Sequence, residues 1–339
     1  MKKSYGLLII LVIICINSLA QDVPLFQAKE PVNLRVTGSI KSIKKKSNDS
    51  TLVTGKFEYD NGHDEWIAVP VQARVRGNFR LQNCFFPPLK LKFNKKNVAA
   101  TLFEGNKALK LVMPCRASKD KDILIRKEYL CYQFYQLLSP YYFRTRLATM
   151  ELTEVSLKKT RQYELLTFFV EDNSMVAQRS QGKILETKKG ISPEAFDEKQ
   201  SVRNDFFQYM IGNADWSAVF QHNSNTMFVQ GSYIPLSYDF DMSGFVDASY
   251  AHQNPPSLGT GDPRERIYRG FCKSKKAMDE IRKEYLEKES AVQAIIDEHE
   301  SHFSKYQVKE MHDYLGQFFD ILKSDSRFAA SILEGCRTN

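Results

Sequence analysis

The chain reads Thr51-Leu-Val-Thr-Gly-Lys-Phe-Glu-Tyr59, then Asp60-Asn-Gly62, then Trp66-Ile-Ala-Val-Pro-Val-Gln-Ala-Arg-Val-Arg76, and this stretch decides how its first third folds. In both longer runs apolar and polar residues alternate, which is the period of a β-strand with one buried face. The Asp60-Asn-Gly62 step is a strong tight-turn signal, because Asn and Gly accept the positive φ that a hairpin turn requires. The stretch therefore predicts an antiparallel β-hairpin.

The same alternation continues on both sides of this hairpin, at residues 33–38, 88–93 and 108–113, so we expect the N-terminal third to form an antiparallel sheet. Helical spacing of apolar residues begins at Ser118 and ends at Ser139-Pro140. The later sequence predicts a strand pair at 147–157 and 163–170, a helix at 202–211, strands at 226–229 and 233–238, and helices within 275–335. The fold class predicted from this order is α+β.

The first twenty residues predict where the protein goes. Lys2 and Lys3 precede an apolar run over residues 7–16, and small residues at Ser18 and Ala20 favour cleavage before Gln21. The apolar run is too short for a stable membrane span. We expect an exported protein, in the periplasm, the cell envelope or the exterior, with no transmembrane span in the mature chain.

The composition limits the partners of the protein. Lys and Arg number 48 against 40 Asp and Glu, a net charge of +8 that is spread along the chain. The basic clusters are not interleaved with aromatic residues as in a nucleic-acid groove, so we expect no nucleic-acid partner. No cysteine pair has the CxxC spacing of a zinc or redox site, and an exported chain has room for up to two disulfides and one free thiol among the cysteines that remain after cleavage, Cys84, Cys115, Cys131, Cys272 and Cys336.

Two acidic loops flank the predicted strands at 226–229 and 233–238. Asp215 precedes the first strand, and Asp239 and Asp241 follow the second. A hairpin returns the chain to the edge where it began, so we expect both loops at the same end of the sheet. Phosphoryl transfer needs such a layout, with one carboxylate to orient a nucleophile and others to hold Mg²⁺ on the phosphates. The alternative is a set of aspartates that only form turns.

Further candidates for nucleotide binding lie in the predicted sheet and the helix after it. Lys110 lies on a strand and Glu128 in the following helix, an order that suits a lysine held for phosphate binding by a glutamate. Lys90 and Lys92 compete for the same role from the preceding strand. Arg76 and Gly77 begin a turn in which the backbone has room to approach phosphates, although a single glycine is a weak signal, and a hairpin turn is the alternative.

A family resemblance rests on Arg74-Val-Arg-Gly-Asn78, Pro88-Leu-Lys-Leu-Lys92, Leu109-Lys-Leu111, Leu124-Ile-Arg126, Asp215 and Tyr238-Asp-Phe-Asp241. Over about residues 70–250 the chain resembles the spore-coat protein H-like (CotH-like) atypical kinases. The resemblance implies a two-lobed kinase-like fold, with an antiparallel N-terminal β lobe and a mainly helical C-terminal lobe. It also implies phosphoryl transfer from ATP, with Mg²⁺ or Mn²⁺, to Ser or Thr of a protein partner.

The same resemblance implies roles for individual residues. Asp215 corresponds to the catalytic-loop carboxylate, and Asp239, Asp241 and Asn223 to the metal ligands. His222, inside the same loop, is a candidate to contact phosphate or orient Asp215, and packing in a turn is its alternative.

These features divide the chain into four parts. We expect a signal peptide (1–20), a β-rich nucleotide lobe (21–117), a bridging helix and strands (118–200), and catalytic loops with a helical lobe (201–339).

Two departures from the family pattern keep other functions open. Asp215 and Asn223 are farther apart than in the general kinase catalytic loop, so an inserted turn over 218–221 is assumed. The glycine turn is followed by Phe79-Arg80 instead of small polar residues. A non-catalytic binding or scaffolding protein, and a protein nucleotidyl transferase, are the alternatives.

Overall fold

A computed structural model of the chain describes residues 23–46, 52–63, 65–155, 159–187, 189–253 and 261–338. The predicted signal peptide and its cleavage site lie outside these residues. Among the described residues no helix is both long and apolar enough to cross a membrane.

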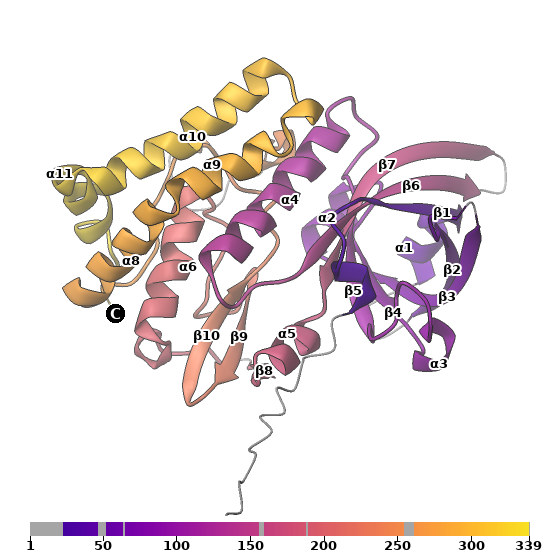
Figure 1. Cartoon of the computed structure of the whole chain (residues 1–339), viewed down its shortest axis with the longest axis horizontal. Coiled ribbons are helices and arrows are strands. Elements are labelled where there is room, and N and C mark those ends of the chain that lie inside the picture. Colours follow the sequence, from indigo (N-terminus) through magenta and orange to yellow (C-terminus); the bar gives the residue numbers. More distant parts are fainter. Residues whose placement is uncertain are drawn as a thin grey trace, which may run out of the picture.

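The N-terminal half forms a closed β-barrel, with the strand order β1–β2–β3–β4–β5–β7–β6 (Figure 1). Neighbouring strands are antiparallel except at the closure, where β1 runs parallel to β6 from Val32 opposite Ala148 to Gly38 opposite Glu154. The strands are β1 (Val32–Gly38), β2 (Val53–Asp60), β3 (Trp66–Val75), β4 (Leu89–Lys92), β5 (Ala108–Val112), β6 (Thr145–Val155) and β7 (Thr160–Glu171). Short helices lie between them, namely η1 (Pro24–Phe26), α1 (Ile40–Lys46), α2 (Asn78–Asn83) and α3 (Lys95–Val98).

The predicted fold class is therefore wrong in its architecture. We expected a two-lobed kinase-like fold with an antiparallel N-terminal sheet, whereas the structure has a closed mixed barrel with helices beside it. The difference comes from the hairpin of β6 and β7. One of its strands pairs with β5 and the other with β1, so the hairpin joins the two edges of the N-terminal sheet.

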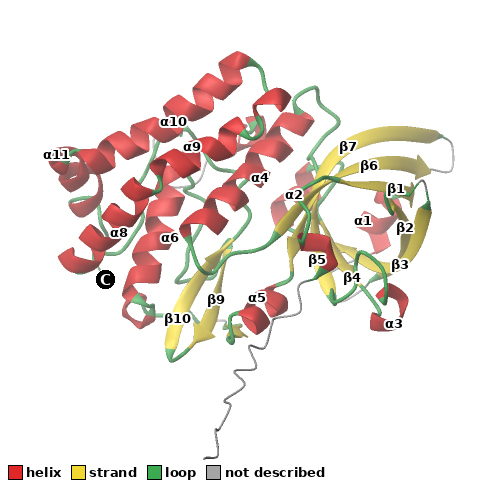
Figure 2. Ribbon diagram, in the orientation of Figure 1, coloured by secondary structure: helices red, strands yellow, loops and turns green. Residues whose placement is uncertain are grey.

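The helical part packs beside the barrel and contains a second small sheet, of order β10–β9–β8 (Figure 2). Its strands are β8 (Lys183–Leu185), β9 (Ser224–Val229) and β10 (Ser232–Ser237). The longer helices are α4 (Lys121–Leu138), α6 (Glu198–Met210), α8 (Lys275–Glu287), α9 (Glu289–Asp297) and α10 (Lys305–Lys323). The shorter ones are α5 (Asn173–Arg179), η2 (Pro193–Ala195), α7 (Ser249–Gln253), η3 (Glu300–His302), α11 (Asp325–Phe328) and η4 (Ala329–Leu333).

Two hydrophobic cores result, one inside the barrel and one among the helices. Helix α4 lies between them, and its apolar face packs on the outside of β7, where Tyr129 and Tyr132 contact Phe168 edge to face. The predicted strands and helices thus exist close to their expected positions, and the error lies in how the strands pair. Because strand pairing across the chain depends on tertiary contacts, local alternation did not reveal the closure.

Among the described residues two disulfides form, Cys84–Cys115 and Cys272–Cys336, and Cys131 is a buried free thiol. The expected limit of two bridges and one thiol is confirmed, and the structure supplies the pairing.

Candidate functional site

The loop after α6 brings Asp215, His222 and Asn223 together, and we call these three residues the exposed cluster. His222 Nε2 lies 2.8 Å from Asp215 Oδ1. The amide nitrogen of Asn223 donates to Asp215 Oδ2 at 3.0 Å and to the Asp215 carbonyl at 2.8 Å. The Asp215 carboxylate is thus held from two sides, while its side chain remains 32% exposed.

The inserted turn expected at residues 218–221 is present and explains the spacing of the exposed cluster. Ser217 and His222 exchange two backbone hydrogen bonds, of 2.9 and 3.0 Å, which close a small hairpin. Gln221 and Asn223 adopt positive φ, of 53° and 47°. The hairpin absorbs the additional residues and returns Asn223 to Asp215.

The hydrogen bond to Asp215 raises the pKa of His222, and burial opposes this effect. The negative charges of Asp215 and Asp239 add to the increase. His222 therefore carries its proton more readily beside Asp215, which fits a residue that holds the carboxylate in place.

A second group of acids lies deeper, where the α4 helix meets the end of β10. Glu128, Asp239 and Asp241 offer carboxylate oxygens within 4.8 Å of one another. Arg80 from α2 lies among them, with Nε 2.8 Å from Asp241 Oδ2 and Nη2 3.0 Å from Glu128 Oε2. We call these four residues the buried cluster, after Arg80, Glu128 and Asp241, which are buried, whereas the side chain of Asp239 is 36% exposed and lies at the edge of the cluster.

Local structure explains how the two aspartates reach this cluster. Phe240 between them is completely buried, and its ring lies 4.7 Å from that of Tyr132 on α4. Asp239 has a φ of 65°, and its N–H donates to the Tyr132 hydroxyl at 3.1 Å. Aspartate tolerates this left-handed conformation better than most residues. Tyr250 on α7 donates to Asp241 Oδ2 at 2.9 Å.

Burial and charge determine the protonation of the buried cluster. Burial raises the pKa of Glu128 to about 8, and Arg80 opposes this shift. Burial also raises the pKa of Asp241, again against the attraction of Arg80. For Arg80 itself burial lowers the pKa, but Asp241 and Glu128 outweigh it, so the guanidinium stays charged. Arg80 is the main counter-charge of these acids.

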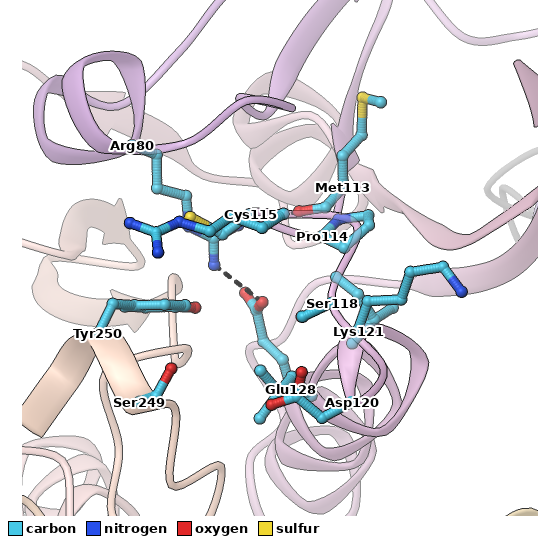
Figure 3. A pocket seen from close by; sticks show the side chains of 13 residues that line it. Arg80, Met113, Pro114, Cys115, Ser118, Asp120, Lys121, Glu128, Ser249 and Tyr250 are labelled. Carbon is cyan, nitrogen blue, oxygen red and sulfur yellow. Dashed lines mark hydrogen bonds and ion pairs between the residues drawn. The ribbon is translucent and has the colours of Figure 1, made fainter. Parts of the chain in front are cut away.

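A pocket of about 110 Å³ opens beside the buried cluster, between α4, α7 and the chain after β5 (Figure 3). Arg80, Glu128 and Tyr250 line its polar side. Glu128 Oε1 is buried and has no hydrogen-bond partner among the described residues. At roughly 30 Å³ per water molecule, the pocket has room for a few waters or a small hydrated cation beside that oxygen.

Lys110 is the most unusual cation of the site. It lies on β5 and is only 5% exposed, and its Nζ has no hydrogen-bond acceptor among the described residues. The Nζ lies 4.2 Å from the ring centre of Tyr238 and 4.4 Å from that of Phe143. Burial lowers its pKa well below the ordinary value, and the charge of Arg76 adds to this, whereas Asp172 and Asp239 oppose it.

The predicted pairing of Lys110 with Glu128 is wrong, because Glu128 pairs with Arg80. Both side chains are at the site, but Lys110 contacts the rings of Tyr238 and Phe143 instead of Glu128. Of the two competing lysines, Lys90 pairs with Asp172 at 3.1 Å, and Lys92 is exposed. Lys110 is therefore the buried lysine among the three.

Arg76 and Gly77 form the predicted turn directly after β3. Gly77 has a φ of 74° and precedes the first residue of α2, so the turn leads into a helix and not into a hairpin. The guanidinium of Arg76 lies 5.8 Å from the ring centre of Tyr238. This turn orients α2 so that Arg80 reaches the acids.

Arg80 is the residue of the site that the sequence did not reveal. In the sequence, Phe79-Arg80 stands out only as a departure from the small polar residues of the family pattern. The acidic partners of Arg80 lie 48 and 161 residues away in the chain, so local sequence does not indicate them. One signal was available in the sequence. Arg80 lies three residues after Gly77, which was itself a candidate for nucleotide binding.

Comparison with protein-family models, with curated protein sequences and with solved structures gives no significant match to this chain. The resemblance to CotH-like kinases stays a prediction from the residues, and the functional argument depends on the site itself.

Proposed function

We propose that this protein binds a nucleotide together with a divalent cation and transfers a phosphoryl group from ATP to a hydroxyl of a protein partner. One observation carries the proposal. The Lys110 amine is buried, has no hydrogen-bond acceptor among the described residues, and lies near the acidic residue Asp239, while burial disfavours its charged form by lowering its pKa. A buried ammonium without an acceptor is costly, and a bound phosphate would supply the missing acceptor.

The acids of the buried cluster fit Mg²⁺ or Mn²⁺. Their ligand atoms are carboxylate oxygens, which both ions prefer, and Glu128 Oε1 has no partner in the described part of the chain. A bound divalent ion would neutralise charge on the phosphates. In this proposal Asp239 and Asp241 hold the ion with Glu128, and Arg80 balances their charge when the ion is absent.

Asp215 is the residue that we assign to the nucleophile. Its carboxylate oxygens accept from His222 and Asn223 and retain lone pairs for a substrate hydroxyl. Because the side chain is partly exposed, a hydroxyl of another protein has access to it. His222 acts here as a positioning residue, and Asn223 fixes the second oxygen, in addition to its predicted role near the cation.

We also propose that the protein is exported. The two disulfides support this, since disulfides persist mainly in oxidising compartments outside the cytosol. They agree with the signal peptide predicted from the first twenty residues.

A second candidate function is binding or scaffolding without catalysis. Arg80 favours it, because its guanidinium already occupies the space between Glu128 and Asp241 with short ion pairs. Such a cluster has a structural role when nothing displaces the arginine. Protein nucleotidyl transfer is the other alternative. It would use the same residues to bind ATP and the metal, but the substrate hydroxyl would attack the α-phosphate instead of the γ-phosphate.

Thermal unfolding with and without ATP and Mg²⁺ or Mn²⁺ tests the proposal. We expect a rise in the unfolding midpoint that requires both ATP and the metal, since a ligand of the native state stabilises it. Asp239→Asn should abolish the rise, and asparagine preserves the left-handed backbone at this position. The matched control is Asp247→Asn, because Asp247 also has a positive φ, of 58°, but pairs with His252 and Arg264 outside the buried cluster.

Labelled ATP then separates the reactions. Transfer of γ-label to protein identifies a kinase, and transfer of α-label identifies a nucleotidyl transferase. Asp215→Asn should retain the metal-dependent midpoint shift and lose transfer. Absence of any shift at millimolar ATP with either metal would contradict the proposal and favour the binding protein.

A further inference from the structure

The interior of the barrel is divided into a filled half and an open half. Four aromatic rings, from Phe57, Phe93, Phe103 and Phe169, fill one half, with ring centres 5.0 to 6.1 Å apart. The other half holds a cavity of about 190 Å³, bounded by all the barrel strands and α1. The cavity walls are mainly aliphatic, and include Leu34, Val71, Ala73, Leu91, Met150 and Leu152.

Two glycines keep this cavity open. Gly38 ends β1 and Gly55 lies in β2, and both line the cavity. Both face inward by alternation, since Gly55 lies two residues before the buried Phe57, and Gly38 follows Leu34 and Val36. They lie at the open end of the cavity, where Gly55 is exposed and Gly38 is half-buried. A Cβ added at either position would meet no atom of the described residues within 4 Å. Neither glycine has a positive φ, so the backbone does not require glycine there, and the missing side chains leave space.

The cavity opens to solvent at one end, and its inner part is space that side chains leave unfilled, whereas protein interiors are normally packed with few such voids. A dry aliphatic cavity of about 150 Å³ is already large enough to bind benzene. The cavity in this barrel is larger, at about 190 Å³, and it has the same kind of wall. Its shape and chemistry therefore suit a small apolar group.

The mouth of the cavity is polar. Thr37, Ser39, Ser42 and Lys56 border it, and Ser39 and the N–H of Ile40 donate to the two oxygens of Glu154, which fixes the start of α1 at the opening. Lys56 is the cation that lines the mouth. On the last turn of α1, Lys44 donates to the Cys84 carbonyl at 2.7 Å, and Lys45 and Lys46 are exposed. An apolar chamber beneath a rim of hydroxyl groups and one lysine, Lys56, fits a molecule with one alkyl chain and a small anionic head that pairs with that lysine.

We propose that the barrel cavity binds the alkyl chain of a small anionic amphiphile, such as a medium-chain carboxylate, with the head at the mouth beside α1. The proposal does not depend on the phosphoryl-transfer function, because it uses other residues. It assigns a second ligand site to the protein.

Titration calorimetry of the full chain with octanoate tests this second site. We expect saturable binding to the native protein. In Gly55→Leu the new side chain would fill the cavity, and the affinity should fall by at least about tenfold because the alkyl chain and the leucine compete for one space. Gln72→Leu is the matched control, since Gln72 is exposed on β3 between Val71 and Ala73 and does not line the cavity, and it should leave the affinity unchanged.

Gly38→Leu provides a second filling variant from a different strand, so that a folding defect of Gly55→Leu would not prevent the test. Butyrate, with a shorter chain, should bind more weakly than octanoate. No saturable octanoate binding to the native protein, or equal binding by a folded filling variant, would overturn the proposal.

Discussion

The buried cluster and the exposed cluster differ in the way the chain assembles them. In the exposed cluster His222 and Asn223 lie seven and eight residues from Asp215, and one small hairpin closes the distance. In the buried cluster Arg80 reaches Glu128 across 48 residues and Asp241 across 161. The first cluster is therefore a product of local sequence, and the second depends on the packing of α2, α4 and the loop after β10.

The two clusters should also differ in how much the free energy of unfolding falls when one of their charges is removed. Arg80 and Asp241 have side chains that are only 6% exposed, whereas His222 is 58% exposed. Charges removed from water depend strongly on their partners, and exposed charges are screened by solvent. Stability measurements can test this contrast directly.

The largest expected effect is that of Arg80→Ala. It leaves the carboxylates of the buried cluster without their counter-charge, and we expect a loss of about 3–5 kcal/mol of unfolding free energy. Urea unfolding measures it. The control is Lys29→Ala, which breaks the exposed Lys29–Glu298 pair and should cost no more than about 1 kcal/mol. Similar losses in both variants would remove the contrast between buried and exposed charges.

The next effect concerns the disulfide that fastens α2. Cys84 follows α2 directly and is bonded to Cys115, so the double variant Cys84→Ser/Cys115→Ser should lose roughly 2–4 kcal/mol of stability. It should also accelerate hydrogen exchange in α2, which carries Arg80. The variant Cys272→Ser/Cys336→Ser removes a disulfide far along the chain and should leave exchange in α2 unchanged. Equal exchange in α2 for both variants would mean that packing alone holds Arg80.

The smallest effect belongs to the exposed cluster. Because the pKa of His222 is raised in the folded protein, its contribution to stability is complete below the ordinary histidine pKa of about 6.5 and is lost as pH rises through the folded value. Exposure limits this contribution to about 1 kcal/mol or less.

An NMR titration of His222 should show the pKa fall towards the ordinary value in Asp215→Asn, which removes the acceptor charge. Asp247→Asn, in another loop, should leave the His222 titration unchanged. A His222 pKa that does not respond to Asp215→Asn would show that the pair does not persist in solution.

Much of the local structure was predictable. Alternation and turn signals gave β2, β3 and the strands around Asp215 and Asp239, and helical spacing gave α4 and α6. The inserted turn between Asp215 and Asn223 was also expected, because these residues are farther apart than in the general kinase catalytic loop. These features depend on neighbours in sequence, where periodicity and turn preferences act.

The errors share one cause, which is long-range pairing. The β6–β7 hairpin closes the barrel by joining β1 and β5, and alternation of residues says nothing about which strand is the neighbour. In the same way, Lys110 and Glu128 were both expected at the site, but their predicted pairing was wrong, because local sequence does not show which charge meets Glu128 in the fold.

The sequence by itself determined the elements, the number of possible disulfides, and the local hairpin that joins Asp215 to His222 and Asn223. Only the tertiary structure decided that the sheet closes, that Arg80 is the partner of the buried acids, and that Gly38 and Gly55 leave a cavity. The physical reason is that backbone preferences act over a few residues, whereas burial and charge pairing depend on which distant segments share a space.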